Sequence, residues 1–181
     1  MKKLTLAVLL VILLVSACAS VPATPQANKP VVMVSVQPQA YFVQKIAGDL
    51  VEVQAMVGTG DDPHTYEPTT EQMRSLTNAQ LYFSIGVEFE AAWLPRFTAA
   101  NPNLKIVDSA EGVVRLPAAP SENGEEAGEP DPHIWLSPSR VKQISANMVA
   151  ALAELDPDNA PIYEQNLETW LQEIDQVDAD I

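Results

Sequence analysis

The 181-residue sequence is poor in the side chains that usually bind metals or form cross-links. It has one cysteine, Cys18, so no disulfide can form within the chain. It has two histidines, His64 and His133. Basic residues are also scarce, because 10 Lys and Arg face 24 Asp and Glu for a formal net charge of −14 at pH 7. This charge makes nucleic acid and anionic lipid surfaces poor partners and suits a cationic ligand.

The N-terminus is typical of a secretory signal. Two lysines precede an apolar run from Leu4 to Val15, which is too short to span a membrane comfortably. The residues that follow end in Cys18 and resemble a bacterial lipobox, in which the cysteine is diacylated and becomes the mature N-terminus. We expect residues 1–17 to be a lipoprotein signal peptide, with Cys18 anchoring the protein to the outer side of the cytoplasmic membrane (periplasm or cell surface). An ordinary signal peptide with an incidental cysteine is the alternative.

A flexible tether is expected next. Residues 18–30 are rich in Ala, Pro, Thr, Gln and Asn, a composition that cannot bury a core. The folded part then begins near Val31 and leaves about 150 residues, enough for one domain with a hydrophobic core.

Strand-like and helix-like segments alternate along the first part of this domain. Apolar or alternating runs predict four strands, at residues 31–36, 51–57, 81–85 and 104–107. Helical spacing predicts helices between them, at 39–49, at 69–79 behind a capping box of Thr69 and Gln72, and around the stripe Phe89, Trp93 and Phe97. This order is typical of an α/β fold with a parallel four-stranded sheet and flanking helices. In such sheets ligands bind beyond the carboxyl ends of the strands.

Two more helices are predicted after the sheet. Ser137-Pro138 and Asp156-Pro157 each place an N-cap residue before a proline in the first turn. The second helix carries an apolar stripe of Tyr163, Leu167, Trp170, Ile174, Val177 and Ile181. The stripe reaches the last residue without a glycine or a cap. A coiled-coil seam is one interpretation; a helix that continues in a longer protein is the one we favour.

Both histidines stand in the same short context. Asp-Pro-His occurs at residues 62–64 and again at 131–133. Proline restricts its own φ and the conformation of the residue before it, so each histidine leaves a rigid, non-helical elbow with a carboxylate two residues back. Imidazole is a common ligand of zinc and other first-row metals. The repeated context favours a shared metal site over two unrelated surface histidines.

A polar loop at residues 117–132 leads into the second elbow. It contains five acidic residues and no basic one: Glu122, Glu125, Glu126, Glu129 and Asp131. A solvated loop is the simplest interpretation. The alternative is a weak, transient collector of cations beside His133, since carboxylates recruit divalent ions but this spacing defines no cage.

With both elbows in view, the chain resembles the ZnuA/TroA-like (cluster A-I) metal-binding proteins of ABC transporters. The matching stretches are Gly58 to Thr69, Asp131 to Pro138, Phe89 to Arg96, and Leu155-Asp156-Pro157. The resemblance implies two α/β lobes joined by one long helix, with the metal between the lobes. Residues 31–155 would be the N-terminal lobe and residues 156–181 the truncated start of the inter-lobe helix. His64 and His133 would be two metal ligands, and the remaining ligands would come from a second lobe that this sequence does not contain.

These observations favour a lipoprotein that captures zinc outside the cytoplasm and delivers it to a membrane-embedded ABC permease. Neutral imidazoles suit zinc, and both the acidic loop and residues 134–137 resemble the zinc members of the family. Manganese is the alternative metal. We expect Glu67, three residues after His64, to accept a hydrogen bond from that imidazole and not to bind the metal itself; a solvent-facing turn carboxylate is the other interpretation.

An enzyme is the competing class of protein. A metal-dependent hydrolase would use His64 and His133 to hold zinc and an acid such as Glu67 to activate water. The sequence has no His-Glu-x-x-His helix and no third nitrogen ligand, whereas catalytic zinc sites generally have three protein ligands and an open position. We therefore expect a binding protein with no catalytic residues. A chain that binds no metal tightly is the third possibility.

Overall fold

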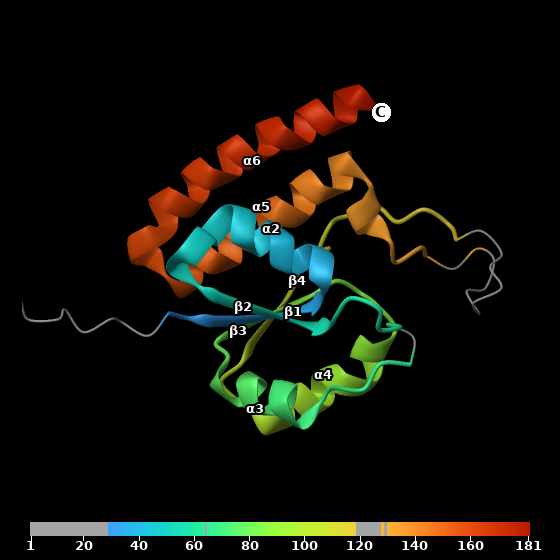
Figure 1. Ribbon diagram of the computed structural model, residues 1–181, viewed down its shortest axis with the longest axis vertical. Coiled ribbons are helices and arrows are strands. Elements are labelled where there is room, and N and C mark those ends of the chain that lie inside the picture. Colours follow the sequence, from blue (N-terminus) through green and yellow to red (C-terminus); the bar gives the residue numbers. More distant parts are fainter. Residues whose placement is uncertain (1–28, 64, 119–127, 129) are drawn as a thin grey trace, which may run out of the picture.

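The computed structural model describes residues 29–63, 65–118, 128 and 130–181, in which two layers of helices enclose one sheet (Figure 1). The four strands are β1 (Val31–Val36), β2 (Glu52–Val57), β3 (Leu81–Ser84) and β4 (Lys105–Asp108). They pair in parallel in the order β2-β1-β3-β4. The predicted parallel four-stranded sheet is confirmed.

Helices cover both faces of the sheet. Helices α2 (Gln37–Ala47), α5 (Pro138–Leu155) and α6 (Ala160–Asp180) lie on one side, and α3 (Thr70–Asn78) and α4 (Phe89–Ala100) lie on the other (Figure 1). Short 3-10 segments occur at η1 (Gly48–Leu50), η2 (Ile134–Leu136) and η3 (Pro157–Asn159). Because the central strands are covered twice, their side chains are buried on both faces, as Val32, Met33 and Val34 of β1 show.

Helix boundaries differ from the prediction in two places, and the predicted N-cap at Ser137 lacks a side-chain hydrogen bond. The helix expected at 39–49 begins at Gln37 and ends at Ala47, and its Tyr41 is half exposed. Ser137 precedes α5, but its hydroxyl makes no capping hydrogen bond and contacts Ser139 instead. Asp156-Pro157 begins η3 and not the α-helix, because Asp156 Oδ2 accepts hydrogen bonds from the side chains of Asn159 and Tyr163. The capping box of Thr69 and Gln72 forms as predicted.

The apolar stripe of α6 is buried or half-buried from Tyr163 to Ile174 and exposed at its end. Tyr163 and Ile174 are buried against the core, and α6 packs on α5 and α2. Trp170 donates from Nε1 to Ser145 of α5 at 3.0 Å. Val177 and Ile181 are 54% and 90% exposed. In the part of the chain that the structure describes, no helix combines the length and apolarity needed to cross a membrane.

The strand order determines where a ligand site is expected. From β1 the chain crosses to β2 on one side, and from β2 it crosses back over β1 to β3 on the other. The connections therefore diverge at the carboxyl ends of β1 and β3, the usual place of a binding crevice in an open parallel sheet.

Candidate metal site

His133 is the predicted ligand that the structure describes. It follows the long loop and directly precedes η2. His64, Cys18, the signal peptide at 1–17, most of the tether at 18–30 and the glutamates of the acidic loop lie outside the described residues. The segment from Gly58 to Pro63 continues from the carboxyl end of β2 toward His64. That His64 and His133 converge therefore stays a prediction.

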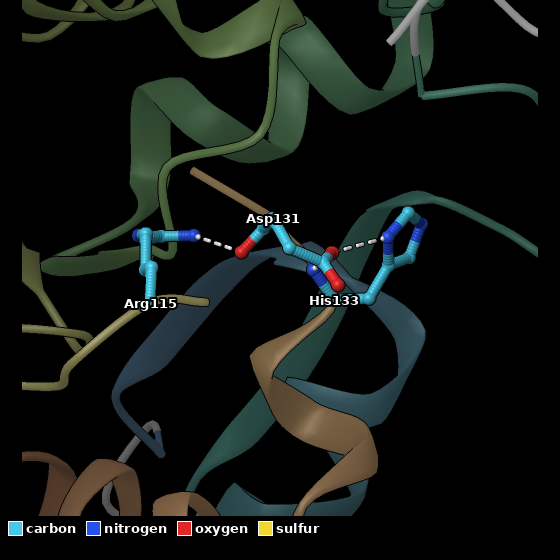
Figure 2. Close-up of polar contacts among 3 residues, drawn as sticks. All are labelled: Arg115, Asp131 and His133. Carbon is cyan, nitrogen blue, oxygen red and sulfur yellow. Dashed lines mark hydrogen bonds and ion pairs between the residues drawn. The ribbon is translucent and has the colours of Figure 1, made fainter. Parts of the chain in front are cut away.

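His133 is held by the carboxylate two residues before it. Asp131 Oδ1 lies 2.8 Å from the backbone nitrogen of His133 and 2.8 Å from its ring Nδ1 (Figure 2). The hydrogen bond from the His133 backbone N–H, with a smaller contribution from the ring, holds the pKa of the Asp131 carboxyl below its usual range. A carboxylate at Nδ1 favours the tautomer with the proton on Nδ1, which places the metal-binding lone pair on Nε2.

An aromatic side chain supports the same imidazole. The rings of His133 and Trp135 meet edge to face, with centroids 5.2 Å apart. About 40% of the His133 side chain is exposed. The ring is therefore oriented on one side by a carboxylate and on another by an indole, yet solvent still reaches it.

The base of the acidic loop is closed by backbone pairing. Pro117 and Pro130 form an antiparallel bridge, and the Asp131 N–H donates to the Leu116 carbonyl at 2.8 Å. The two ends of the loop therefore lie side by side, and Asp131 and His133 directly follow the returning end.

Arg115 connects this elbow to the sheet. Its Nη2 donates to the Ile85 carbonyl, which directly follows β3, at 2.5 Å, and its Nη1 donates to the Asp131 carbonyl at 3.4 Å (Figure 2). These contacts place the elbow at the carboxyl edge of the sheet. Open parallel sheets bind their ligands at this edge. Sequence reasoning did not single out Arg115, because a lone arginine in a loop carries no local signal.

A buried carboxylate at the switch point was also not predicted. Glu90 is 4% exposed and accepts hydrogen bonds from the Ser35 hydroxyl at 2.5 Å and from the N–H groups of Ile85 and Gly86 at 2.8 Å each. Burial raises the pKa of Glu90 above its ordinary value, although the three hydrogen bonds oppose the shift. Glu90 follows Phe89, the first residue of an apolar stripe, and this position is the feature of the sequence that could have indicated its burial.

Gln39 links the neighbouring chain segments from inside the fold. Its Oε1 accepts from the N–H groups of Ser35 and Val36 at 3.0 and 3.1 Å. Its Nε2 donates to the Ser84 carbonyl at 3.2 Å and to the Ser109 hydroxyl at 3.0 Å. One buried side chain thus joins the carboxyl ends of β1, β3 and β4 and stabilises the edge of the sheet beneath the site.

Glu67 lies in a different setting from His133. It is exposed in the loop before α3 and lines an open cavity of about 310 Å³ with Asp61, Asp62, Thr65, Tyr66, Thr69 and Gln72. Among the described residues, no group of three or more His, Cys, Asp or Glu side chains is arranged to hold a metal ion. The predicted hydrogen bond from the His64 ring to Glu67 stays a prediction.

Comparison with known proteins gives a consistent match. The ZnuA family, described as zinc-uptake complex component A periplasmic, matches residues 32–181. The manganese ABC transporter substrate-binding lipoprotein PsaA of Streptococcus anginosus is 31% identical over 147 residues, covering 78% of this chain and 47% of its own length. The iron ABC transporter substrate-binding lipoprotein MtsA of Streptococcus pyogenes serotype M6 is 30% identical over 190 residues, covering 99% of this chain and 60% of its own.

A solved structure agrees with the fold. A zinc-bound deletion mutant of ZnuA superimposes with a TM-score of 0.76 at 43% identity, over 84% of this chain and 57% of that one. The chain thus spans about half the length of the relatives it matches. Both Streptococcus relatives are named as substrate-binding lipoproteins of ABC transporters, which agrees with the expectation of a binding protein.

Proposed function

The chain belongs to the ZnuA family of periplasmic metal-binding proteins, and we propose that it captures a divalent metal ion outside the cytoplasm for delivery to a membrane-embedded ABC permease. The observation that carries the proposal is the His133 elbow. A carboxylate orients the imidazole at the carboxyl edge of a parallel sheet, the edge at which such folds bind their ligands.

His64 is proposed as the second ligand from this chain. It shares the Asp-Pro-His context of His133 and follows a segment that leaves the same edge of the sheet from β2. Two imidazoles do not complete a zinc coordination sphere, which usually has four ligands. The remaining positions would be filled by groups from beyond this sequence or by water.

Zinc is the proposed metal. Two neutral nitrogen ligands suit zinc, whereas manganese sites draw mainly on carboxylate, carbonyl and water oxygen. The named relatives include manganese and iron proteins at about 30% identity, and the zinc-bound ZnuA structure matches at 43%. Manganese is the alternative, and a comparison of the Zn²⁺ and Mn²⁺ affinities of the chain distinguishes the two metals.

Anchoring at the membrane completes the proposal. The relatives are named as lipoproteins, and Cys18 stands at the end of a signal-like segment. We propose that diacylated Cys18 holds the binding domain on the outer side of the cytoplasmic membrane, within reach of the permease, through the tether at residues 18–30. Two acyl chains give stable anchoring, whereas one gives only marginal binding.

A competition titration tests the function. The full chain in mild detergent would be titrated with Zn²⁺ and Mn²⁺ against a chromophoric chelator, and assayed for hydrolysis of ester and peptide substrates. We expect zinc to bind more tightly than manganese, His133→Ala to weaken zinc binding, and no turnover to occur. Glu168→Ala, which removes an exposed carboxylate from α6, is the control. Zinc affinity unchanged by His133→Ala would reject the site.

A further inference from the structure

Arg115 joins the end of β3 to the Asp131–His133 elbow, and we propose that it is a positioning residue for metal capture at His133. The inference rests on the proposed function, since it concerns the geometry of the same site. Arg115 itself does not touch the metal. It acts through Asp131, the residue that orients the imidazole.

The sheet end of this connection is rigid. Glu90 is buried and fixes the N–H groups of Ile85 and Gly86, so the Ile85 carbonyl points in a set direction. Arg115 Nη2 bonds that carbonyl at 2.5 Å. A charged donor on a carbonyl makes a stronger bond than a neutral one. The guanidinium is therefore held at the carboxyl end of a central strand.

Gly86 leaves the space in which the guanidinium lies. A Cβ at this position would stand 2.4 Å from Arg115 Nη2, a distance at which something must move. The residue also has a φ of +80°, a conformation that other residues rarely adopt. Gly86 and Arg115 therefore form a matched pair, and a side chain at one displaces the other.

The loop end of the connection holds both backbone groups of Asp131. Arg115 Nη1 reaches the Asp131 carbonyl at 3.4 Å, a long contact. The adjoining Leu116 carbonyl accepts the Asp131 N–H at 2.8 Å, which is the firmer bond. Fixing residues 115 and 116 thus fixes the Asp131 backbone, and the Asp131 carboxylate then sets the ring of His133.

The charge of Arg115 separates a positioning role from an electrostatic one. A guanidinium is always protonated, and its positive charge near a metal site opposes cation binding. If charge decided, removing Arg115 would tighten metal binding. If position decides, removing it weakens binding.

The first experiment measures Zn²⁺ affinity by chelator competition in the full chain. Arg115→Met should weaken binding about tenfold, the lower end of the effect typical for residues that orient a ligand. Arg115→Lys, which keeps the charge but not the two-pronged geometry, should recover part of the loss. Arg96→Met removes the charge of an exposed arginine stacked on Trp93 and should change little.

A double-mutant cycle with Gly86→Ala tests the pairing. Both changes break the same contact, so the two losses in affinity should be strongly non-additive. Loss of thermal stability should be closer to additive, because the φ strain at residue 86 does not depend on Arg115. Additive losses in affinity would overturn the pairing of the two residues.

A second readout needs no metal. Amide hydrogen exchange at Asp131 and His133 should be faster in Arg115→Met than in the unsubstituted chain, while exchange at the core residue Val34 stays unchanged. Wild-type or tighter Zn²⁺ affinity in Arg115→Met overturns the proposal whatever the exchange rates. If the unsubstituted chain binds no Zn²⁺, the proposed function fails and exchange alone decides: faster exchange supports positioning of the elbow by Arg115, and unchanged exchange overturns it.

Discussion

Asp131 Oδ1 accepts two hydrogen bonds from His133, one from its backbone nitrogen and one from its ring Nδ1, each 2.8 Å long. One oxygen atom therefore fixes both the position of the residue and the rotation of its imidazole. Pro132 lies between the two residues and restricts the backbone conformations available to this segment, which helps to keep the arrangement in place.

Replacing Asp131 should therefore weaken metal binding without unfolding the domain. We expect Asp131→Ala to lower Zn²⁺ affinity by ~10–100-fold, the range typical of carboxylates that orient a metal-binding histidine. Asp131→Asn keeps a hydrogen-bond acceptor without the charge, so its Zn²⁺ affinity should lie between those of the unsubstituted chain and Asp131→Ala. Competition titration measures the affinities, and Asp178→Ala, which removes an exposed carboxylate near the end of α6, is the control. Equal affinity in Asp131→Ala would show that the elbow is formed without its carboxylate.

Glu90 should make the stability of the fold depend on pH. Burial raises its pKa in the folded state, so the folded chain retains a proton that the unfolded chain releases near pH ~4.3. The stability that this protonation contributes is complete below that pH and is lost as pH rises through the folded-state pKa. Glu90→Gln removes the titration.

Urea denaturation of the metal-free chain at several pH values measures this effect. The destabilisation caused by Glu90→Gln should be larger near pH 4 than at pH 7, because only the unsubstituted chain loses the contribution of protonated Glu90 across that interval. The control Glu168→Gln removes an exposed carboxylate. The free energy of unfolding would be compared between the unsubstituted chain and Glu90→Gln. A difference that stays constant, or grows with rising pH, would contradict the raised pKa of Glu90.

The segments that sequence predicted well carry their signal locally. Runs such as Val31–Val36 are apolar because a strand covered on both faces must be. The capping box of Thr69 and Gln72 forms within four residues. Boundaries were less certain, as at Asp156, whose carboxylate bonds Tyr163 instead of capping a helix.

The unpredicted parts of the site depend on contacts between distant segments. Arg115 bonds Ile85, thirty positions earlier in the chain, and Glu90 bonds Ser35 across the sheet. Neither partner can be chosen before the strand order is known, because β1 and β3 become neighbours only through the crossover after β2. The prediction that the two histidines bind metal rests on the repeated Asp-Pro-His context, which the sequence shows without the fold.

Lipid attachment at Cys18 is tested by fractionation. The unsubstituted protein expressed in a bacterium should sediment with membranes, whereas Cys18→Ser should be released or keep its signal peptide, because the diacylation site is gone. Immunoblots of membrane and soluble fractions, with mass analysis of the N-terminus, distinguish the outcomes. Membrane association that persists in a processed Cys18→Ser protein would rule out the lipobox.

Glu67 is tested by a neutral substitution of the same shape. If it accepts a hydrogen bond from the His64 ring, Glu67→Gln should reduce Zn²⁺ affinity by at least ~10-fold. Glu71→Gln in the first turn of α3 is a matched control on the neighbouring exposed surface. Unchanged affinity would assign Glu67 to the solvent-facing turn.

The most direct measurement is X-ray absorption at the zinc edge of the zinc-loaded chain, which counts imidazole ligands and their distances. We predict nitrogen ligation from His64 and His133 near 2.0–2.1 Å, the usual zinc–imidazole distance. His64→Ala and His133→Ala should each lose one imidazole and gain an oxygen ligand. A zinc spectrum without imidazole, or one that neither substitution alters, would contradict the assignment of both histidines as metal ligands.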